Sequence, residues 1–203
     1  MMACCGVEKH PWEIHYVERV WLPKVLRCFV IGENPGDKTS QYFYEPPADY
    51  TSDAVVVRRA LLRGLHRHRL IRDATLEAFR DAGFLFDHAI RCQLDSDTVG
   101  VERQRATRYR CRRVEDPAHL RARIGTASVV WVMGHLASNA VANATPEFPR
   151  QRRRISMPPF PGSIAPGSRF FLSEYLRWRT ESEGSRFCEA FRQFAQERGL
   201  QCV

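Results

Sequence analysis

The sequence has no apolar run long enough to cross a membrane. Its longest runs, such as 127–133, are far shorter than the roughly 20 residues that a spanning helix needs. It also has no internal repeat and no low-complexity segment. Residues 1–9 lack the basic segment followed by an apolar one that begins a signal peptide. These absences predict a cytoplasmic protein with no membrane partner.

The cysteines lack the Cys-x-x-Cys spacing that marks a zinc ribbon. Their total is seven, an odd number. In a cytosolic chain the default is a set of free, mostly buried thiols. The cysteine pattern therefore argues against a zinc ribbon and favours free thiols.

Lysine is scarce. Only three of the 31 basic residues are lysines (Lys9, Lys24 and Lys38), so 28 are arginines. The formal net charge is +8, which attracts polyanions such as a phosphodiester backbone. Arginine can also hold two phosphate oxygens in a bidentate fork, which lysine cannot. The balance favours a nucleic-acid partner, with a GC-rich genome that selects arginine codons as the alternative explanation.

What is present is the composition of a folded protein: 203 residues, of which 44% are hydrophobic and 27% charged. This length fits one large domain or two small ones, and no linker-like stretch divides the chain. We expect a single domain spanning 1–203 and a monomeric protein.

Short apolar runs alternate with segments of helical periodicity. The runs predict strands at 24–31, 84–90 and 127–133, and a fourth strand at 155–157. Helical spacing predicts helices at 53–70, 75–82, 116–124, 137–144, 169–179 and 185–199. The alternation is typical of an α/β fold with a mostly parallel four-stranded sheet. In such sheets ligands bind at the carboxyl ends of the strands, so we expect the loops 32–45, 87–95, 134–139 and 158–169 to converge on one site.

Four of these segments carry a resemblance to a known family. Val30–Asp37 (VIGENPGD) resembles the first motif of the uracil-DNA glycosylase superfamily, in which a strand ends in Gly-x-(Asp/Asn/Ala)-Pro-(Gly/Tyr). Segments 84–92 and 129–137 are similar to its second and third strand ends, and 157–171 occupies the position of its DNA-inserting loop. The resemblance implies a three-layer α/β/α fold and a monofunctional DNA glycosylase. Such an enzyme hydrolyses the N-glycosidic bond of a flipped base, uracil or a modified cytosine or purine, and leaves an abasic site.

The resemblance implies catalytic roles for two neighbouring residues. Asn34 stands where the family carries its water-holding Asp or Asn, and an amide can position water but cannot act as a strong base. The alternative role for Asn34 is a tight turn before Pro35. Glu33 is the nearest carboxylate, and it could assist the water or accept hydrogen bonds from loop amides.

Base recognition is assigned by the same resemblance to five residues: Gly32, Phe43, Tyr44, Asp87 and His88. Phe43 or Tyr44 would stack on the flipped base, with core packing as the alternative. An ionised Asp87 can only accept hydrogen bonds, which suits a base with an exocyclic amine. Asp87 could instead be structural, and His88 would then face the base.

The last segment lacks the histidine that many family members use to stabilise the departing base. Ser163 lies in this segment, and Ile164 would wedge into the base stack unless it merely packs within the loop. The candidates for phosphate contacts are Arg152, Arg153 and Arg169, for which a solvated charged surface is the alternative. The missing histidine keeps a second function open: a nucleic-acid-binding protein on the same fold that has weak or no catalysis.

No cofactor is required by this chemistry. One branch of the superfamily, however, holds a four-cysteine iron–sulfur cluster. By that resemblance the ligands would be Cys4, Cys5, Cys92 and Cys111. The adjacent Cys4 and Cys5 depart from the spaced pair of that branch, so a [4Fe-4S] cluster and free thiols both remain open.

Overall fold

The structure is a computed structural model, and it describes residues 20–33, 43–44, 56–89, 118–148, 162–173 and 181–200. Its strands are β1 (Cys28–Gly32), β2 (Phe84–His88), β3 (Val129–Met133), β4 (Gly162–Ser163) and β5 (Phe170–Ser173). Its helices are α2 (Val56–Arg67), α3 (Leu76–Asp81), α5 (Ala118–Thr126), α6 (His135–Ala144) and α7 (Glu181–Gln196). Within the described residues no helix is both long and apolar enough to cross a membrane.

The strands form one five-stranded sheet in the order β2-β1-β3-β5-β4. The first four are parallel neighbours, and β4 pairs with β5 in the antiparallel direction. All five residues of β1 and of β3 are buried. Continuous burial is typical of parallel strands covered on both faces, which explains why these strands are apolar without alternation. The predicted α/β fold with a mostly parallel sheet is confirmed.

The fourth parallel strand is not where the sequence placed it. Phe170–Ser173 forms β5 beside β3, whereas we predicted a helix over 169–179. Its run of large apolar residues fits a buried helix turn as well as a buried strand, and only pairing with Val130–Met133 decides between them. The predicted strand at 155–157 lies outside the described residues.

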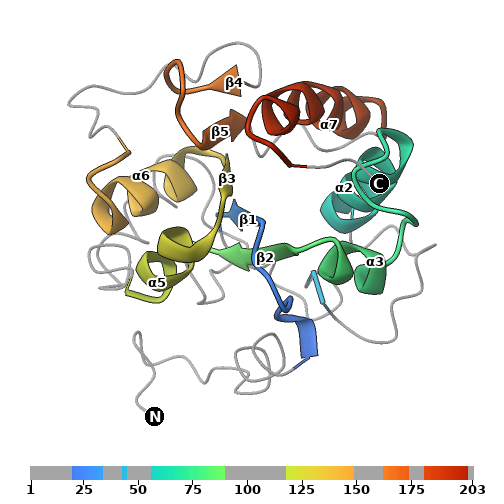
Figure 1. Cartoon of the computed structure of the whole chain (residues 1–203), viewed down its shortest axis with the longest axis horizontal. Coiled ribbons are helices and arrows are strands. Elements are labelled where there is room, and N and C mark those ends of the chain that lie inside the picture. Colours follow the sequence, from blue (N-terminus) through green and yellow to red (C-terminus); the bar gives the residue numbers. More distant parts are fainter. Residues whose placement is uncertain are drawn as a thin grey trace, which may run out of the picture.

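Helices lie on both sides of the sheet. Figure 1 shows α5 and α6 on one side and α2 and α7 on the other. The pair α2 and α7 packs closely through two glycines. A Cβ atom on Gly64 would come 2.6 Å from Cys188 Sγ, and one on Gly184 would come 2.9 Å from Ala60 Cβ. Five of the predicted helices are confirmed, with ends that differ by up to four residues.

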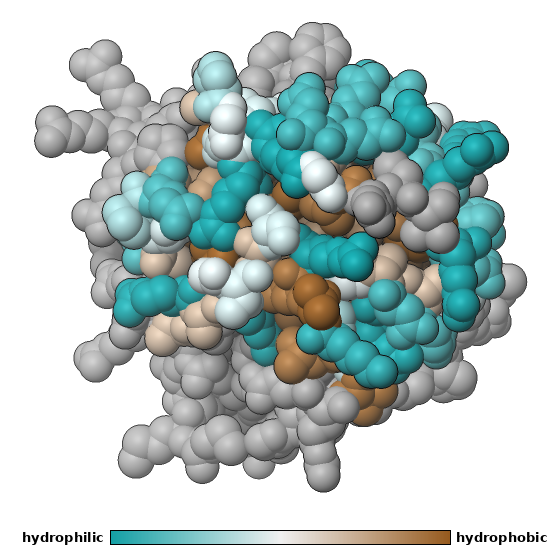
Figure 2. All heavy atoms as spheres, viewed as in Figure 1, coloured by the Kyte–Doolittle hydropathy of each residue, from teal (hydrophilic) through white to brown (hydrophobic). Residues whose placement is uncertain are grey.

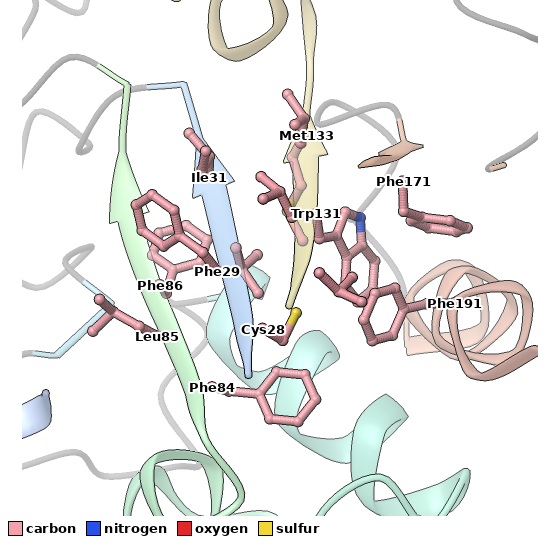
Figure 3. Packing of buried hydrophobic residues seen from close by; sticks show 14 of the residues in the cluster. Cys28, Phe29, Ile31, Phe84, Leu85, Phe86, Trp131, Met133, Phe171 and Phe191 are labelled. Carbon is pink, nitrogen blue, oxygen red and sulfur yellow. The ribbon is translucent and has the colours of Figure 1, made fainter. Parts of the chain in front are cut away.

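Aromatic side chains fill the core between the sheet and α7. Trp131 of β3 stacks on Phe191 of α7 with ring centroids 4.4 Å apart, and Figure 3 shows the two rings facing each other. The indole Nε1 of Trp131 donates to Ser173 Oγ at 2.8 Å, so this buried ring also joins β3 to β5. Cys28 and Cys188 are free thiols buried in this core, the default state that the cysteine pattern favoured.

Candidate functional site

The carboxyl ends of β1, β2 and β3 lie side by side. Gly32, the last residue of β1, is opposite His88 of β2, and its carbonyl accepts a hydrogen bond from Ala89 N at 2.8 Å. On the other side, Ile31 is opposite Val132 of β3. The residues that begin the three loops after these strands therefore meet at one edge of the sheet, as the sequence predicted.

The chain changes direction at this edge. From β1 it passes to β2 on one side, and from β2 it crosses back to β3 on the other side of β1. The gap between the loops that follow β1 and β3 is a topological switch point, which is where open α/β sheets bind their ligands.

Glu33 bridges the switch point. Its Oε1 accepts a hydrogen bond from Leu136 N at 3.2 Å, in the first turn of α6. Gly134, the N-cap residue of α6, has φ 89°, and a Cβ there would collide with the Glu33 carboxylate. A carboxylate at a helix N-terminus satisfies an otherwise orphaned N–H and faces the positive end of the helix dipole. The contact matches one of the two roles expected for Glu33, the acceptance of amide hydrogen bonds.

Asp87 has a structural role here. Its side chain is only 6% exposed, and its Oδ2 forms an ion pair with Arg123 Nη1 from the last turn of α5. Its Oδ1 accepts a hydrogen bond from the backbone N of His88 at 2.8 Å. Both oxygens thus accept from donors of this chain, which favours the structural alternative left open for Asp87 over the reading of an exocyclic amine. Arg123 carries no sequence signal of this role, because nothing local marks one arginine among 28 as the buried partner.

His88 is the base-reading candidate that remains at this edge. It is half-buried beside Gly32, and its ring lies edge-on to Phe86 with centroids 5.1 Å apart. A neutral imidazole has one donor and one acceptor nitrogen, so it can pair with a carbonyl or an amine according to its tautomer.

Phe43 and Tyr44 belong to the core. Phe43 is 4% exposed and stacks on Phe86 at 4.2 Å, and Tyr44 is 7% exposed and stacks on Trp21 at 5.5 Å. The Tyr44 hydroxyl also accepts a hydrogen bond from Phe86 N at 2.7 Å and so covers the free edge of β2. These contacts leave little ring surface for a base, and core packing replaces the stacking role expected of this pair.

Arg169 lies at the opposite edge of the sheet. Its Nη1 donates to the carbonyls of Ile124 and Ala127, both at 2.7 Å, and its Nε donates to Glu147 Oε2 at 2.8 Å. These bonds tie the start of β5 to the segment that precedes β3. Arg169 is therefore a structural residue in this fold, and the expectation that it grips phosphate beside the other loops is corrected.

Ser163 and Ile164 lie where the chain runs away from the carboxyl ends of the parallel strands. Because β4 runs antiparallel to β5, the chain after Gly162 heads toward the amino ends of the parallel strands. Ser163 Oγ donates to Ala165 O at 2.6 Å, and Ile164 packs partly buried against the core, the alternative left open for it. The loop 158–169 therefore does not converge with the others where it is described. The carboxyl end of β5 is instead Ser173, whose carbonyl accepts from Gly134 N at 2.9 Å.

Several candidates lie outside the described residues: Asn34, Arg152, Arg153, Cys4, Cys5, Cys92 and Cys111. Asn34 is the residue that follows Glu33, whose carboxylate accepts the hydrogen bond from Leu136 N of α6. In the part of the chain that the structure describes, no group of three or more His, Cys, Asp or Glu side chains could hold a metal ion.

Comparisons of the chain with protein-family models, with curated proteins and with solved structures find no match.

Proposed function

We propose that this chain is a monofunctional DNA glycosylase on a three-layer α/β/α fold like that of the uracil-DNA glycosylase superfamily. It would flip a damaged or modified base and hydrolyse its N-glycosidic bond. The observation that carries the proposal is the contact between Glu33 and Leu136 N. It joins the GENPG segment to the segment after β3, two of the motifs on which the resemblance rests.

The surroundings of this contact suit the reaction. Cleavage develops negative charge on the departing base, and donors aimed at that charge lower the barrier. A ring N–H of His88 beside Gly32 can supply one such donor in place of the missing loop histidine. Asn34, next to Glu33, would hold the attacking water with its amide. The net charge of +8 favours DNA as the polyanion that carries the base.

The ion pair of Asp87 widens the range of substrates to be tested. Because Asp87 is paired with Arg123, His88 would be the residue that recognises the base. An imidazole can pair with an exocyclic amine or equally well with a carbonyl. Both uracil-like bases and modified cytosines therefore remain substrates of the proposed enzyme.

The test is a cleavage assay on labelled oligonucleotides. Each carries one base: uracil, thymine in a mismatch, hypoxanthine, hydroxymethylcytosine or glucosylated cytosine. Alkali then cuts any abasic site. We expect one substrate to be cut, with a loss of about 100-fold or more in Asn34→Ala and in His88→Ala. Asn139→Ala and His66→Ala, both at exposed helix positions, are the matched controls and keep full activity. Cleavage that survives Asn34→Ala contradicts the assigned role.

A second candidate is a nucleic-acid-binding protein on the same fold without catalysis. It is favoured by the segment 157–171, which has no histidine to stabilise a departing base, and by Asn34, whose amide is too weak a base to activate water. Salt-sensitive DNA binding without cleavage of any base in the panel would establish this function instead.

A further inference from the structure

A groove lined by both apolar and charged side chains lies at the amino ends of β1 and β2, at the edge opposite the candidate site. Among the described residues, the exposed large hydrophobic side chains are Val20 at 39%, Leu22 at 48% and Val25 at 65%. All three line the same hollow of about 580 Å³. Figure 2 shows apolar surface in the lower centre of this face, where Figure 1 draws the segment that leads into β1. Clustered exposed apolar side chains mark an interaction site more often than scattered ones do.

Backbone hydrogen bonds fix the segment that forms one side of the groove. The carbonyl of Gly83 accepts hydrogen bonds from Arg27 N at 2.9 Å and Cys28 N at 3.1 Å, which fixes the segment to the start of β2. Gly83 has φ 86°, and a Cβ there would come 2.8 Å from Val25 O. The chain therefore approaches Gly83 as closely as a glycine permits, and the backbone that carries Val25 is held in place before any partner binds.

Positive charge surrounds the apolar side chains. Lys24, Arg27 and Arg80 line the groove, and Asp81 is the acidic residue among the described lining residues. Asp81 Oδ1 accepts hydrogen bonds from Arg80 Nε at 3.0 Å and Nη2 at 2.9 Å, and Arg80 Nη1 donates to Val20 O at 3.3 Å. These bonds hold the guanidinium of Arg80 at the rim, while Lys24 and Arg27 add charge that no carboxylate among the described lining residues balances.

We propose that this groove binds an acidic peptide segment of a partner protein that carries bulky aliphatic or aromatic side chains. Such a segment would bury Val20, Leu22 and Val25 and place its carboxylates near the three cations. A nucleic acid fits less well, because a phosphodiester gains nothing from aliphatic side chains. The nearby indole of Trp21 is buried and offers no surface for base stacking. The groove is independent of the proposed glycosylase site, which lies at the other ends of the strands.

The test measures binding of a fluorescein-labelled amphipathic peptide of Glu and Leu to the full chain by fluorescence polarisation. Two control peptides replace every Glu by Gln or every Leu by Ser. The chain variants are Val25→Asp and Lys24→Glu at the groove and Arg63→Glu on the exposed surface of α2. Val25 is largely exposed, so its replacement leaves the core intact.

We expect saturable binding of the Glu/Leu peptide and weaker binding of both control peptides. Val25→Asp should raise the dissociation constant roughly tenfold, because it removes the apolar contact that the bound peptide would bury and adds repulsion between Asp and the Glu side chains of the peptide. Arg63→Glu should change the dissociation constant by less than about twofold. Equal binding by all three variants, or no saturable binding, overturns the proposal. So does a single-stranded oligonucleotide that displaces the peptide and loses affinity in the same groove variants, because the groove would then be a nucleic-acid site.

Discussion

The carboxylate of Glu33 accepts a hydrogen bond from the backbone N–H of Leu136, 103 positions further along the chain. Through this bond the loop after β1 is anchored to the first turn of α6. The bond lies where the chain order reverses between β1 and β3, so one carboxylate joins the residue after β1 to the helix after β3 at the candidate site.

Replacing Glu33 should therefore loosen α6 as well as the loop. We expect Glu33→Ala to lower the free energy of unfolding by about 1 kcal/mol, the usual cost of losing a helix cap. Glu33→Gln should cost less, because its amide oxygen can still accept from Leu136 N and only the charge at the helix end is lost. Urea denaturation followed by circular dichroism gives both values. Equal losses in the two variants would mean that the hydrogen bond contributes little.

The buried pair of Asp87 and Arg123 predicts a large difference between two similar substitutions. Asp87→Asn leaves the Arg123 guanidinium, only 12% exposed, without its counter-charge and should cost about 3 kcal/mol. Asp81→Asn breaks an ion pair whose carboxylate is 50% exposed and should cost less than about 1 kcal/mol. Adding Arg123→Met to Asp87→Asn should restore part of the loss. If the double variant loses more free energy of unfolding than the two single variants lose together, the unpaired buried charge is not the cause.

Two glycines should respond in opposite directions to alanine. Gly134→Ala places a Cβ against the Glu33 carboxylate at φ 89°, so we expect a loss of roughly 1–3 kcal/mol. Gly125→Ala lies in α5 with nothing within 4 Å of the new Cβ, and it should gain about 0.5–1 kcal/mol. Thermal melting compares the two directly. A stable Gly134→Ala protein would show that the loop around Glu33 can move aside.

The hydroxyl of Tyr44 predicts a pH dependence. Desolvation by burial raises the pKa of Tyr44 well above its ordinary value. In the unfolded chain this phenol loses its proton above about pH 10, whereas in the folded chain it keeps it, so its contribution to stability falls as the pH rises. Tyr44→Phe removes the acceptor of Phe86 N and should cost about 1–2 kcal/mol at pH 7. That deficit should shrink above pH 10, and an unchanged deficit in urea denaturation at pH 11 would refute the linkage.

The buried thiols should resist alkylation. Burial raises the pKa of Cys28 and of Cys188, so the reactive thiolate is scarce in the folded chain. We expect iodoacetamide at pH 8 to leave both unlabelled until urea is added, as read by mass spectrometry of their peptides. A cysteine introduced by Val25→Cys, at a position 65% exposed, is the control and should label at once. Rapid labelling of Cys188 would mean that α2 and α7 separate readily.

The sequence predicted those parts of the fold that depend on local patterns, namely short apolar runs and helical periodicity. Strands β2 and β3 lie within the predicted runs 84–90 and 127–133, and β1 overlaps the run 24–31 and ends one residue beyond it, at Gly32. Each run is apolar enough to be buried on both faces of the sheet. Their parallel order and the meeting of their loops followed from the alternation with helices. The segment 170–173 escaped prediction because its short apolar run fits two structures, and only β3 beside it selects the strand.

The sequence by itself determined the fold class, the three adjacent strand ends and the surplus of arginine. Only the tertiary structure decided which polar side chains are available there. It commits Asp87 to Arg123, Arg169 to the carbonyls before β3, and Glu33 to α6. The reason is physical: a charged side chain that is fully or partly buried must find a partner, and packing in space chooses that partner at separations of 36 to 103 residues that no local pattern records.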